Sequence, residues 1–450
     1  MRRWRWFVGV GLLAVASAGV AMAAVLTRSF PQAPWPAMGE DFFDGWSPGE
    51  GWAALYREVS GLDAPDLHPH EPLLSPFHLE PDPIGSLLLA NIEEDPDRVY
   101  LGFEPQWFTG GWAGEGMVVL GWRTDGLVDV FHEAGIDLDP ELYRITGEGM
   151  HRMAEREFRP RILEFGPGGV HMDLGFHDLE GRQVELFVRE TDPGTRRPFG
   201  LLAPVGGAAV RPPALPLVLL RDFDFVRRRG TEIRLAIEGR EHAPDPLALP
   251  MAGSRVWFWR YSPKAVVVRV NPEDRVLVEP VRSLGEVPDP ARGPGSFQGT
   301  GSSHANRMEG ISRPHGRVEL RRFEVEVEGD TVAIELHPPL PHLTALAPGS
   351  QAAGQFRISA HPSLGSVDGE WSVQAEEGGR VHMEVTPSGG WTPGPAPRSA
   401  NLLFRVVDLF RGWPTTYRWE ASLEPTSPGA GDAYRLDARW IRTTEHPGGA

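Results

Sequence analysis

The sequence predicts a mainly β protein made of two consecutive antiparallel meander β-barrels or sandwiches that follow an N-terminal hydrophobic helix. From residue 117 onward apolar and polar residues alternate, which is the period of a strand with one buried face. The 53 glycines and 44 prolines supply many turns and disfavour long helices. At about 100–200 residues per domain, a chain of 450 residues is long enough for two folded units.

Five segments repeat one hairpin pattern. In each, the apolar alternation runs into a short loop and resumes with the same parity, so that apolar residues lie opposite one another. Four loops have three residues and end on glycine, which readily adopts the left-handed conformation that such loops require. The fifth is the two-residue loop Gly329-Asp330. The apolar pairs predicted at these loops are Trp122–Val128, Phe176–Val184, Phe225–Ile233, Ala375–Val381 and Val327–Val332.

The other predicted elements are three short helices and five strands. The helices are expected at residues 49–62, 82–95 and 139–158, and the strands at Arg255–Tyr261, Ala265–Val270, Leu402–Phe410, Thr416–Leu423 and Tyr434–Ile441. The predicted organisation is a signal peptide or transmembrane anchor at 1–30, a Pro-rich lead-in with short helices at 31–100, a first β-barrel domain at 101–282, a linker loop at 283–316 and a second β domain at 317–450.

The N-terminus predicts export. Three arginines precede Trp6–Leu26, a run of 21 residues without a charge, which is long enough for a bilayer span of ~20 residues. The positive residues before this run place the N-terminus inside and the body of the chain outside. Cleavage after Ala21-Met22-Ala23 is the alternative. We therefore expect an extracytoplasmic protein that is anchored at its N-terminus or secreted.

Composition narrows the classes of partner. The formal net charge of -17 argues against nucleic acid as a partner. The chain has no cysteine, which excludes disulfides and thiolate chemistry. No phosphate-cradling loop, nucleotide fingerprint, zinc pattern or hydrolase elbow occurs, so no cofactor is predicted.

Two aspartates in "LLRDFDFVRRRG" form the first candidate site. Asp222 and Asp224 are two residues apart, so on a strand they share a face and resemble a general acid and base. The hairpin register places Asp224 opposite Arg234, which would hold its pKa down, whereas catalysis needs one raised pKa. A structural ion pair is therefore the expectation, and an acid/base or metal role is the alternative.

His132 is the second candidate. The hairpin register places it opposite Val118, on the same face as Leu120, Trp122 and Val130. It is either a satisfied core histidine or a titratable group inside a barrel, where a binding or hydratase site needs one. We predict that Trp122, Trp257 and Trp259 bind ligand, with core packing as the alternative explanation for the alternating tryptophans in "RVWFWRY".

Three further groups of polar residues have simpler explanations. His68, His70 and His78 lie among prolines and are expected in an irregular loop. His171, Asp173 and His177 are expected on a solvated strand face. Ser302, Ser303 and His304 are too close in sequence for a typical catalytic triad. We predict no metal site in any of them.

The segment "GFEPQWFTGGWAGEG", Gly102 to Gly116, and the hairpin after it resemble the opening of the first barrel in double lipocalin-like (calycin) proteins related to carotenoid hydratases, where a glutamate precedes aromatic residues. The resemblance implies two lipocalin-like barrels over residues 100–445 whose interiors bind apolar molecules such as lipids or isoprenoids. No catalytic residue is transferred.

These observations lead to three functional hypotheses. The first is an exported, membrane-anchored double β-barrel that binds an apolar or amphipathic small molecule. The second is a hydratase or isomerase that uses His132 or the pair Asp222 and Asp224 on an apolar substrate. The third is a structural or glycan-binding envelope protein with exposed tryptophans.

Overall fold

A computed structural model describes residues 77–272, 295–298, 306–312 and 318–443, with short gaps at 111–112, 167, 192–195, 248–254, 328, 344–345, 407–409, 411 and 426–433. All described residues fall within one compact unit. The predicted N-terminal anchor, the lead-in up to residue 76 and the candidates Ser302, Ser303 and His304 lie outside the described residues.

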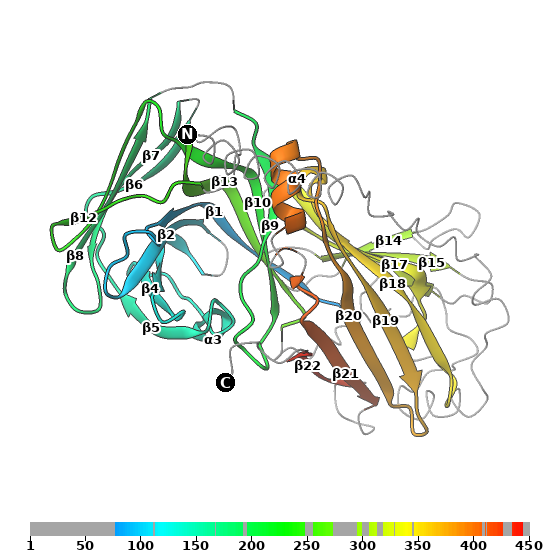
Figure 1. The fold of residues 1–450 in the computed structure, drawn as a ribbon. Helices are drawn as coiled ribbons and strands as arrows, with labels where there is room; N and C mark the ends of the chain where they lie inside the picture. The colour runs from blue at the N-terminus through cyan, green and yellow to red at the C-terminus, as the bar shows by residue number, and fades with distance from the viewer. Residues whose placement is uncertain are drawn as a thin grey trace, which may run out of the picture. The chain divides into compact units, whose positions relative to one another are not determined.

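The described residues form a mainly β protein with three sheets, one of them an antiparallel half-barrel (Figure 1). The first sheet has eight strands in the order β5-β4-β3-β2-β1-β13-β10-β9. All of its neighbouring strands are antiparallel except β4 and β5. Its strands are β1 (Leu79–Asn91), β2 (Tyr100–Thr109), β3 (Glu115–Arg123), β4 (Val128–His132), β5 (Met150–Glu155), β9 (Phe199–Ala203), β10 (Leu215–Arg227) and β13 (Val256–Val270).

The second sheet has five strands in the order β12-β11-β8-β7-β6, and the third has nine strands in chain order, β14 to β22. The five are β6 (Arg161–Gly166), β7 (Gly169–His177), β8 (Gln183–Glu190), β11 (Thr231–Ile237) and β12 (Arg240–His242). The nine are β14 (Gly295–Gln298), β15 (Asn306–Ser312), β16 (Val318–Val327), β17 (Asp330–Leu340), β18 (Gln351–Ser359), β19 (Ser366–Ala375), β20 (Val381–Thr392), β21 (Tyr417–Pro425) and β22 (Tyr434–Arg442). Strands β14 and β15 lie within the segment for which a linker is predicted.

Three of the five predicted hairpins are confirmed in register. Trp122 pairs with Val128, Phe176 with Val184 and Ala375 with Val381. The loop glycines have the expected positive φ, for example 82° at Gly126. The residues of the turns therefore predict these three registers correctly.

The fourth hairpin is shifted by two residues. Val325 rather than Val327 pairs with Val332, because the turn lies one residue earlier and Val327 already pairs with Asp330. A shift of two keeps every side chain on its predicted face, so the buried set of the hairpin is unchanged.

The fifth predicted hairpin is wrong. Strands β10 and β11 are consecutive, but β10 pairs with β9 and β13 whereas β11 pairs with β8 and β12. The chain leaves one sheet and enters another at Arg228–Gly230. The alternation of apolar and polar residues along a strand does not determine which strand pairs with it. Strand β10 has 13 residues and pairs with the longer strand β13.

The helix predictions are largely wrong. Residues 82–95 belong mostly to strand β1, and the helix predicted at 139–158 is reduced to α3 (Pro140–Tyr143), which Asp139 caps by accepting from the N–H of Glu141. Conversely, helix α4 (Arg398–Val406) lies where a strand was expected. A short 3-10 helix, η4 (Pro362–Leu364), precedes β19. The two strands predicted at 255–261 and 265–270 are one continuous strand, β13.

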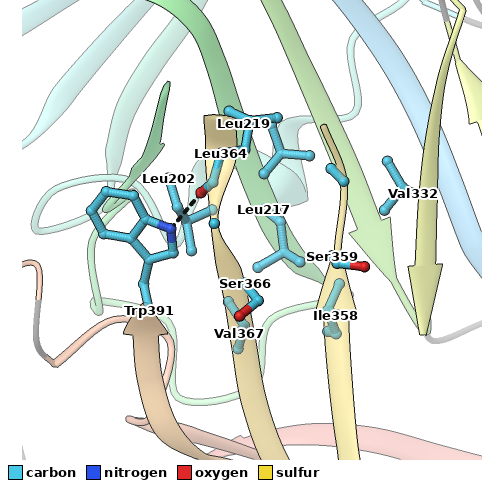
Figure 2. Close-up of a pocket in the computed structure, with 12 residues that line it drawn as sticks. Leu202, Leu217, Leu219, Val332, Ile358, Ser359, Leu364, Ser366, Val367 and Trp391 are labelled. Carbon is cyan, nitrogen blue, oxygen red and sulfur yellow. Dashed lines mark hydrogen bonds between the residues drawn. The ribbon is translucent and has the colours of Figure 1, made fainter. Parts of the chain in front are cut away.

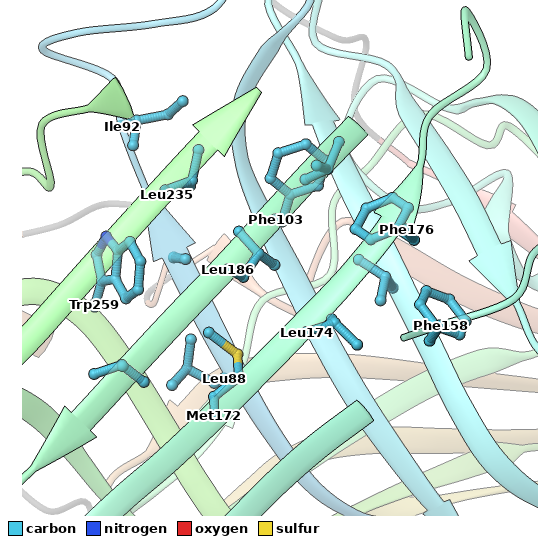
Figure 3. Packing of buried hydrophobic residues seen from close by; sticks show 14 of the residues in the cluster. Leu88, Ile92, Phe103, Phe158, Met172, Leu174, Phe176, Leu186, Leu235 and Trp259 are labelled. Carbon is cyan, nitrogen blue, oxygen red and sulfur yellow. The ribbon is translucent and has the colours of Figure 1, made fainter. Parts of the chain in front are cut away.

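One hydrophobic core lies between the eight-stranded and five-stranded sheets (Figure 3). Phe103 packs edge-on against Phe176 across this layer, with ring centroids 5.7 Å apart. Strand β4 is buried on both faces, since Val128, Asp129, Val130 and Phe131 are all fully buried. The expectation of one solvated face holds for β7 and β8 but is wrong for β3 and β4.

No helix among the described residues is long and apolar enough to cross a membrane. The segment that carries the predicted anchor lies outside those residues.

Candidate functional site

The two aspartates of "LLRDFDFVRRRG" do not form a pair. Asp222 has a positive φ of 53° and is exposed, with its carboxylate 3.8 Å from Lys264 Nζ. Asp224 lies opposite Tyr261 and faces the side of the sheet that carries the core. The left-handed backbone at Asp222 thus breaks the simple alternation that would place both carboxylates on one face.

Asp224 belongs to a buried ionic group at the edge of the core. Its Oδ2 lies 3.4 Å from Arg196 Nη1, and the same guanidinium donates to Glu190 Oε2 at 2.7 Å and to the hydroxyl of Tyr261. Burial raises the pKa of Asp224 even though Arg196 lowers it. Its partner is therefore Arg196, and not Arg234, which pairs with Glu185 instead.

His132 has the predicted cross-strand neighbour, Val118. Its side chain is half-buried, and Nδ1 lies 3.0 Å from the carbonyl oxygen of Glu133. It faces away from the core cluster, whereas Asp224 faces toward it. The two candidate acid/base residues therefore lie on opposite faces of the eight-stranded sheet and do not meet at one site.

The three tryptophans named as ligand-binding candidates occupy different settings. Trp259 is fully buried in the core and donates from Nε1 to the carbonyl oxygen of Asn91 at 2.9 Å. Trp257 is half-buried beneath the guanidinium of Arg228, which lies 4.3 Å from the ring centroid. Trp122 is half-buried on the face opposite the core. Of the three, Trp122 contacts a half-buried carboxyl group.

That carboxyl group is Glu104 on β2, which lies in the segment Gly102 to Gly116 but is not among the predicted site residues. Glu104 pairs with Leu120, which pairs with Val130, so it shares the otherwise apolar face of β3 and β4. Glu104 Oε1 accepts from Gln106 Nε2 at 2.9 Å, and Oε2 accepts from Trp122 Nε1 at 3.2 Å. Burial raises the pKa of Glu104, and these donors lower it only in part.

Arg260 on β13 is the cationic group of the same face. It pairs with Leu89 of β1, and the pairing of Leu87 with Gln106 sets Leu89 opposite Glu104. Arg260 and Glu104 are thus two strands apart, about 10 Å between Cα atoms at ~4.8 Å per strand. Burial lowers the pKa of Arg260 to about 10, and Glu104 opposes that change.

We call this group the Glu104 cluster. It consists of Leu89, Asn91, Glu104, Gln106, Trp122, Phe258 and Arg260. Within it Arg260 Nη1 donates to Asn91 Oδ1 at 2.8 Å, and the guanidinium stacks 4.2 Å from the ring centroid of Phe258. Glu104 and Arg260 make no direct ion pair, and both are half-buried. Polar groups that are desolvated yet retain accessible surface are typical of binding and catalytic sites.

The segment between β4 and β5 folds back over this face. A side chain at Gly147 would lie 3.3 Å from Val128 and 3.4 Å from Trp122. Gly147 also forms a parallel bridge with Gly206 and donates to the carbonyl oxygen of Val205. This cover explains why both faces of β3 and β4 are buried.

A second, smaller feature is an apolar pocket between strands β9 and β10 and strands β17 to β19 (Figure 2). Its volume of about 20 Å³ holds roughly one water molecule. The indole of Trp391 lies at one side and donates from Nε1 to the carbonyl oxygen of Leu364 at 2.7 Å. A row of aromatic rings, Phe404, Phe199 and Phe223, continues from Trp391 at centroid spacings of 4.8, 5.7 and 5.2 Å.

The remaining polar candidates occupy ordinary settings. His171 and His177 lie on the solvated face of β7, opposite Arg189 and Gln183, as predicted. His78 is buried and contacts Glu80 at 3.0 Å. Among the described residues no three histidines or carboxylates are placed to hold a metal ion.

By its fold the described part of the chain is a mainly β protein, with a half-buried carboxyl and a half-buried guanidinium on one face of its eight-stranded sheet. Comparison with known proteins does not narrow this class: no family model, no curated protein and no solved structure matches the chain.

Proposed function

We propose that this protein is exported, held at a membrane by its N-terminal segment or secreted, and that it binds an apolar or amphipathic small molecule. The observation that carries the proposal is the half-buried surface of Leu89, Glu104, Trp122, Phe258 and Arg260 on one face of the eight-stranded sheet. Sites for small molecules combine apolar walls with a few polar groups that fix orientation, and this composition supports such a role.

The proposal is tested by recovering the bound molecule. The full chain is purified, extracted with organic solvent and analysed by mass spectrometry beside the double variant Leu89→Asp and Phe258→Asp. An apolar compound found with the wild type and lost from the variant would support the proposal. Equal recovery from both, with correct folding of both by circular dichroism, would reject binding at the Glu104 cluster.

A second candidate is a hydratase or isomerase of apolar substrates, and the raised pKa of Glu104 favours it. A raised pKa favours the protonated form of a carboxyl group, which is the form that acts as a general acid on a double bond. Incubating recovered ligand with the protein in deuterated water tests this role. Deuterium incorporation that Glu104→Gln abolishes is the expected result, and unlabelled ligand would remove this candidate.

Glycan binding through exposed tryptophans receives no support from the described residues. None of the tryptophans among them is exposed, and Trp371, Trp419 and Trp440 are fully buried.

A further inference from the structure

We infer that the polar group of the bound molecule is an uncharged hydroxyl or carbonyl held between Arg260 and Glu104. This inference rests on the proposed function and specifies the chemical class of its ligand. It follows from the charges and unused hydrogen-bonding groups of the Glu104 cluster.

An anionic head group is disfavoured because the charge of Arg260 is already compensated. Glu93 and Asp245 both interact favourably with the guanidinium. Asn91 links two of these groups, since it accepts from Arg260 Nη1 at 2.8 Å and donates to Glu93 Oε1 at 2.6 Å. One cation and two carboxylates already have a negative charge in excess, and a ligand anion would increase that excess in a poorly solvated place.

A cationic head group is disfavoured on two grounds. Arg260 lies two strands from Glu104 and would repel a second cation on this face. The carboxyl of Glu104 is held by two neutral donors, Gln106 and Trp122, and has no cationic partner within ion-pair distance. Burial raises the pKa of this carboxyl, which favours its neutral form and weakens its attraction for an ammonium group.

A neutral hydroxyl group matches the hydrogen-bonding groups of Arg260 and Glu104 that remain unused. Arg260 has five N–H donors, and only Nη1 makes hydrogen bonds, to Asn91 and to the carbonyl oxygen of Phe258. Nε and Nη2 are left to donate to a ligand oxygen. A hydroxyl group both accepts from such a donor and donates to a carboxyl oxygen, so it serves Arg260 and Glu104 together.

The apolar residues of the cluster define where the rest of the molecule lies. Leu89 stands between Arg260 and Glu104 on the intervening strand, and Phe258 and Trp122 flank the same row. A hydrocarbon chain beside the polar group therefore meets an aliphatic side chain and two aromatic rings. An amphipathic alcohol is the simplest molecule with both parts.

The test uses three photoreactive diazirine probes with the same twelve-carbon chain, ending in a hydroxyl, a carboxylate or an ammonium group. Each is crosslinked at pH 7 to the full chain, and labelled peptides are mapped by mass spectrometry. We expect the hydroxyl probe to label the peptides of Leu89, Trp122 and Phe258 about tenfold more than the other two, the ratio that corresponds to ~1.4 kcal/mol.

Variants separate a specific polar contact from general partition of the probe. Arg260→Met should reduce labelling by the hydroxyl probe about tenfold, as expected on losing a charge-assisted hydrogen bond. Arg228→Met is the matched control, because Arg228 also stacks on an aromatic ring, that of Trp257, but lies outside the cluster. Glu104→Leu should reduce labelling, and Glu104→Gln should restore most of it, since Gln106 can turn its amide to accept from the new one.

The outcomes distinguish the two proposals. Equal or greater labelling of the cluster by the carboxylate or the ammonium probe would overturn the inference of an uncharged group and leave the binding function standing. No labelling of the cluster by any of the probes would overturn both. Circular dichroism of each variant shows whether it is folded, and Glu104→Gln supplies a readout if Arg260→Met does not fold.

Discussion

The indole of Trp122 donates to the carboxyl of Glu104 at 3.2 Å, across two neighbouring strands on one face of the eight-stranded sheet. Both side chains are half-buried, and Glu104 also accepts from Gln106. The hydrogen bond therefore fixes the orientation of a carboxyl group that water solvates poorly.

Trp122→Phe removes this donor and retains an aromatic ring. We expect the free energy of unfolding to fall by about 1–3 kcal/mol, because a poorly solvated acceptor loses a partner. Urea denaturation followed by circular dichroism measures the change. Trp107→Phe is the control, since Trp107 is also half-buried but its indole N–H makes no hydrogen bond to the described residues. An equal loss in both variants would contradict the role given to the Trp122 donor.

Asp224 should make the protein less stable as the pH rises above the pKa that this carboxyl group has in the unfolded state. Burial raises its folded pKa above 3.8, so the folded state holds this proton more tightly than the unfolded state does. The contribution is present in acid and is lost as pH rises from about 3.8 through the raised folded pKa. Asp224→Asn should remove this trend, and wild-type minus variant unfolding free energies from pH 4 to 7 measure it. A difference that grows with pH in favour of the wild type would refute the assignment.

Asp97 should behave in the opposite sense. Burial raises its pKa, but hydrogen bonds from the N–H of Val99 and from Arg182 outweigh burial and lower it below 3.8. Its stabilising contribution is present above pH 3.8 and is lost as pH falls through the lowered folded pKa. The stability gap between wild type and Asp97→Asn should therefore narrow between about pH 5 and pH 2. A gap that is constant over this range would show that the carboxylate of Asp97 is not stabilised by these donors.

The apolar pocket beside Trp391 has room for one added methylene group. Val367→Ile should stabilise the protein by up to about 0.8 kcal/mol, since the pocket of about 20 Å³ accepts the extra carbon without displacing neighbours. Val373→Ile, on the same face of the same strand but away from the pocket, should cost about 1–3 kcal/mol by overpacking. Thermal unfolding of both variants tests the pair, and destabilisation by both would show that the pocket does not accept the carbon.

Gly147 is required where the β4–β5 segment crosses the Glu104 cluster. It has a φ of 57°, and a Cβ atom would approach the carbonyl oxygen of Gly126 to 2.8 Å. Gly147→Ala should therefore cost more stability than Gly181→Ala, which has a similar φ of 78° but open space around it. If the variant also exposes Trp122, its fluorescence quenching by acrylamide should rise. Equal costs for the two glycines would mean that the crossing segment adapts freely.

The sequence predicted local pairing well and long-range pairing poorly. Turn glycines and matching parity identified the hairpins at Trp122, Phe176 and Ala375, because residues within a few positions of the turn decide such registers. The same rule failed for Phe225, whose strand pairs with residues far along the chain. Alternation says which residues share a face but not which strand lies beside them.

The same limit explains why Glu104 was not among the site residues predicted from the sequence. Its partners Gln106 and Trp122 follow from local register, and extending the hairpin at Trp122 by one strand would have placed Glu104 on the apolar face. Arg260 is more than 150 positions away in the chain and reaches this face only through the pairing of β1 with β13. Asp222 and Asp224 were predicted instead because they are only two residues apart in the sequence, although the left-handed backbone at Asp222 separates their side chains.

The pairing of β1 with β13 also sets the order of events in folding. Leu79 lies beside Val270, so the first strand of the eight-stranded sheet has no permanent neighbour on that side until almost 200 further residues have been synthesised. Such distant pairing slows folding and leaves a strand edge open in the meantime. A protein assembled in this way depends on being kept apart from other chains until its middle portion arrives, so slowing its translation after residue 250 should promote aggregation more than slowing it after residue 300.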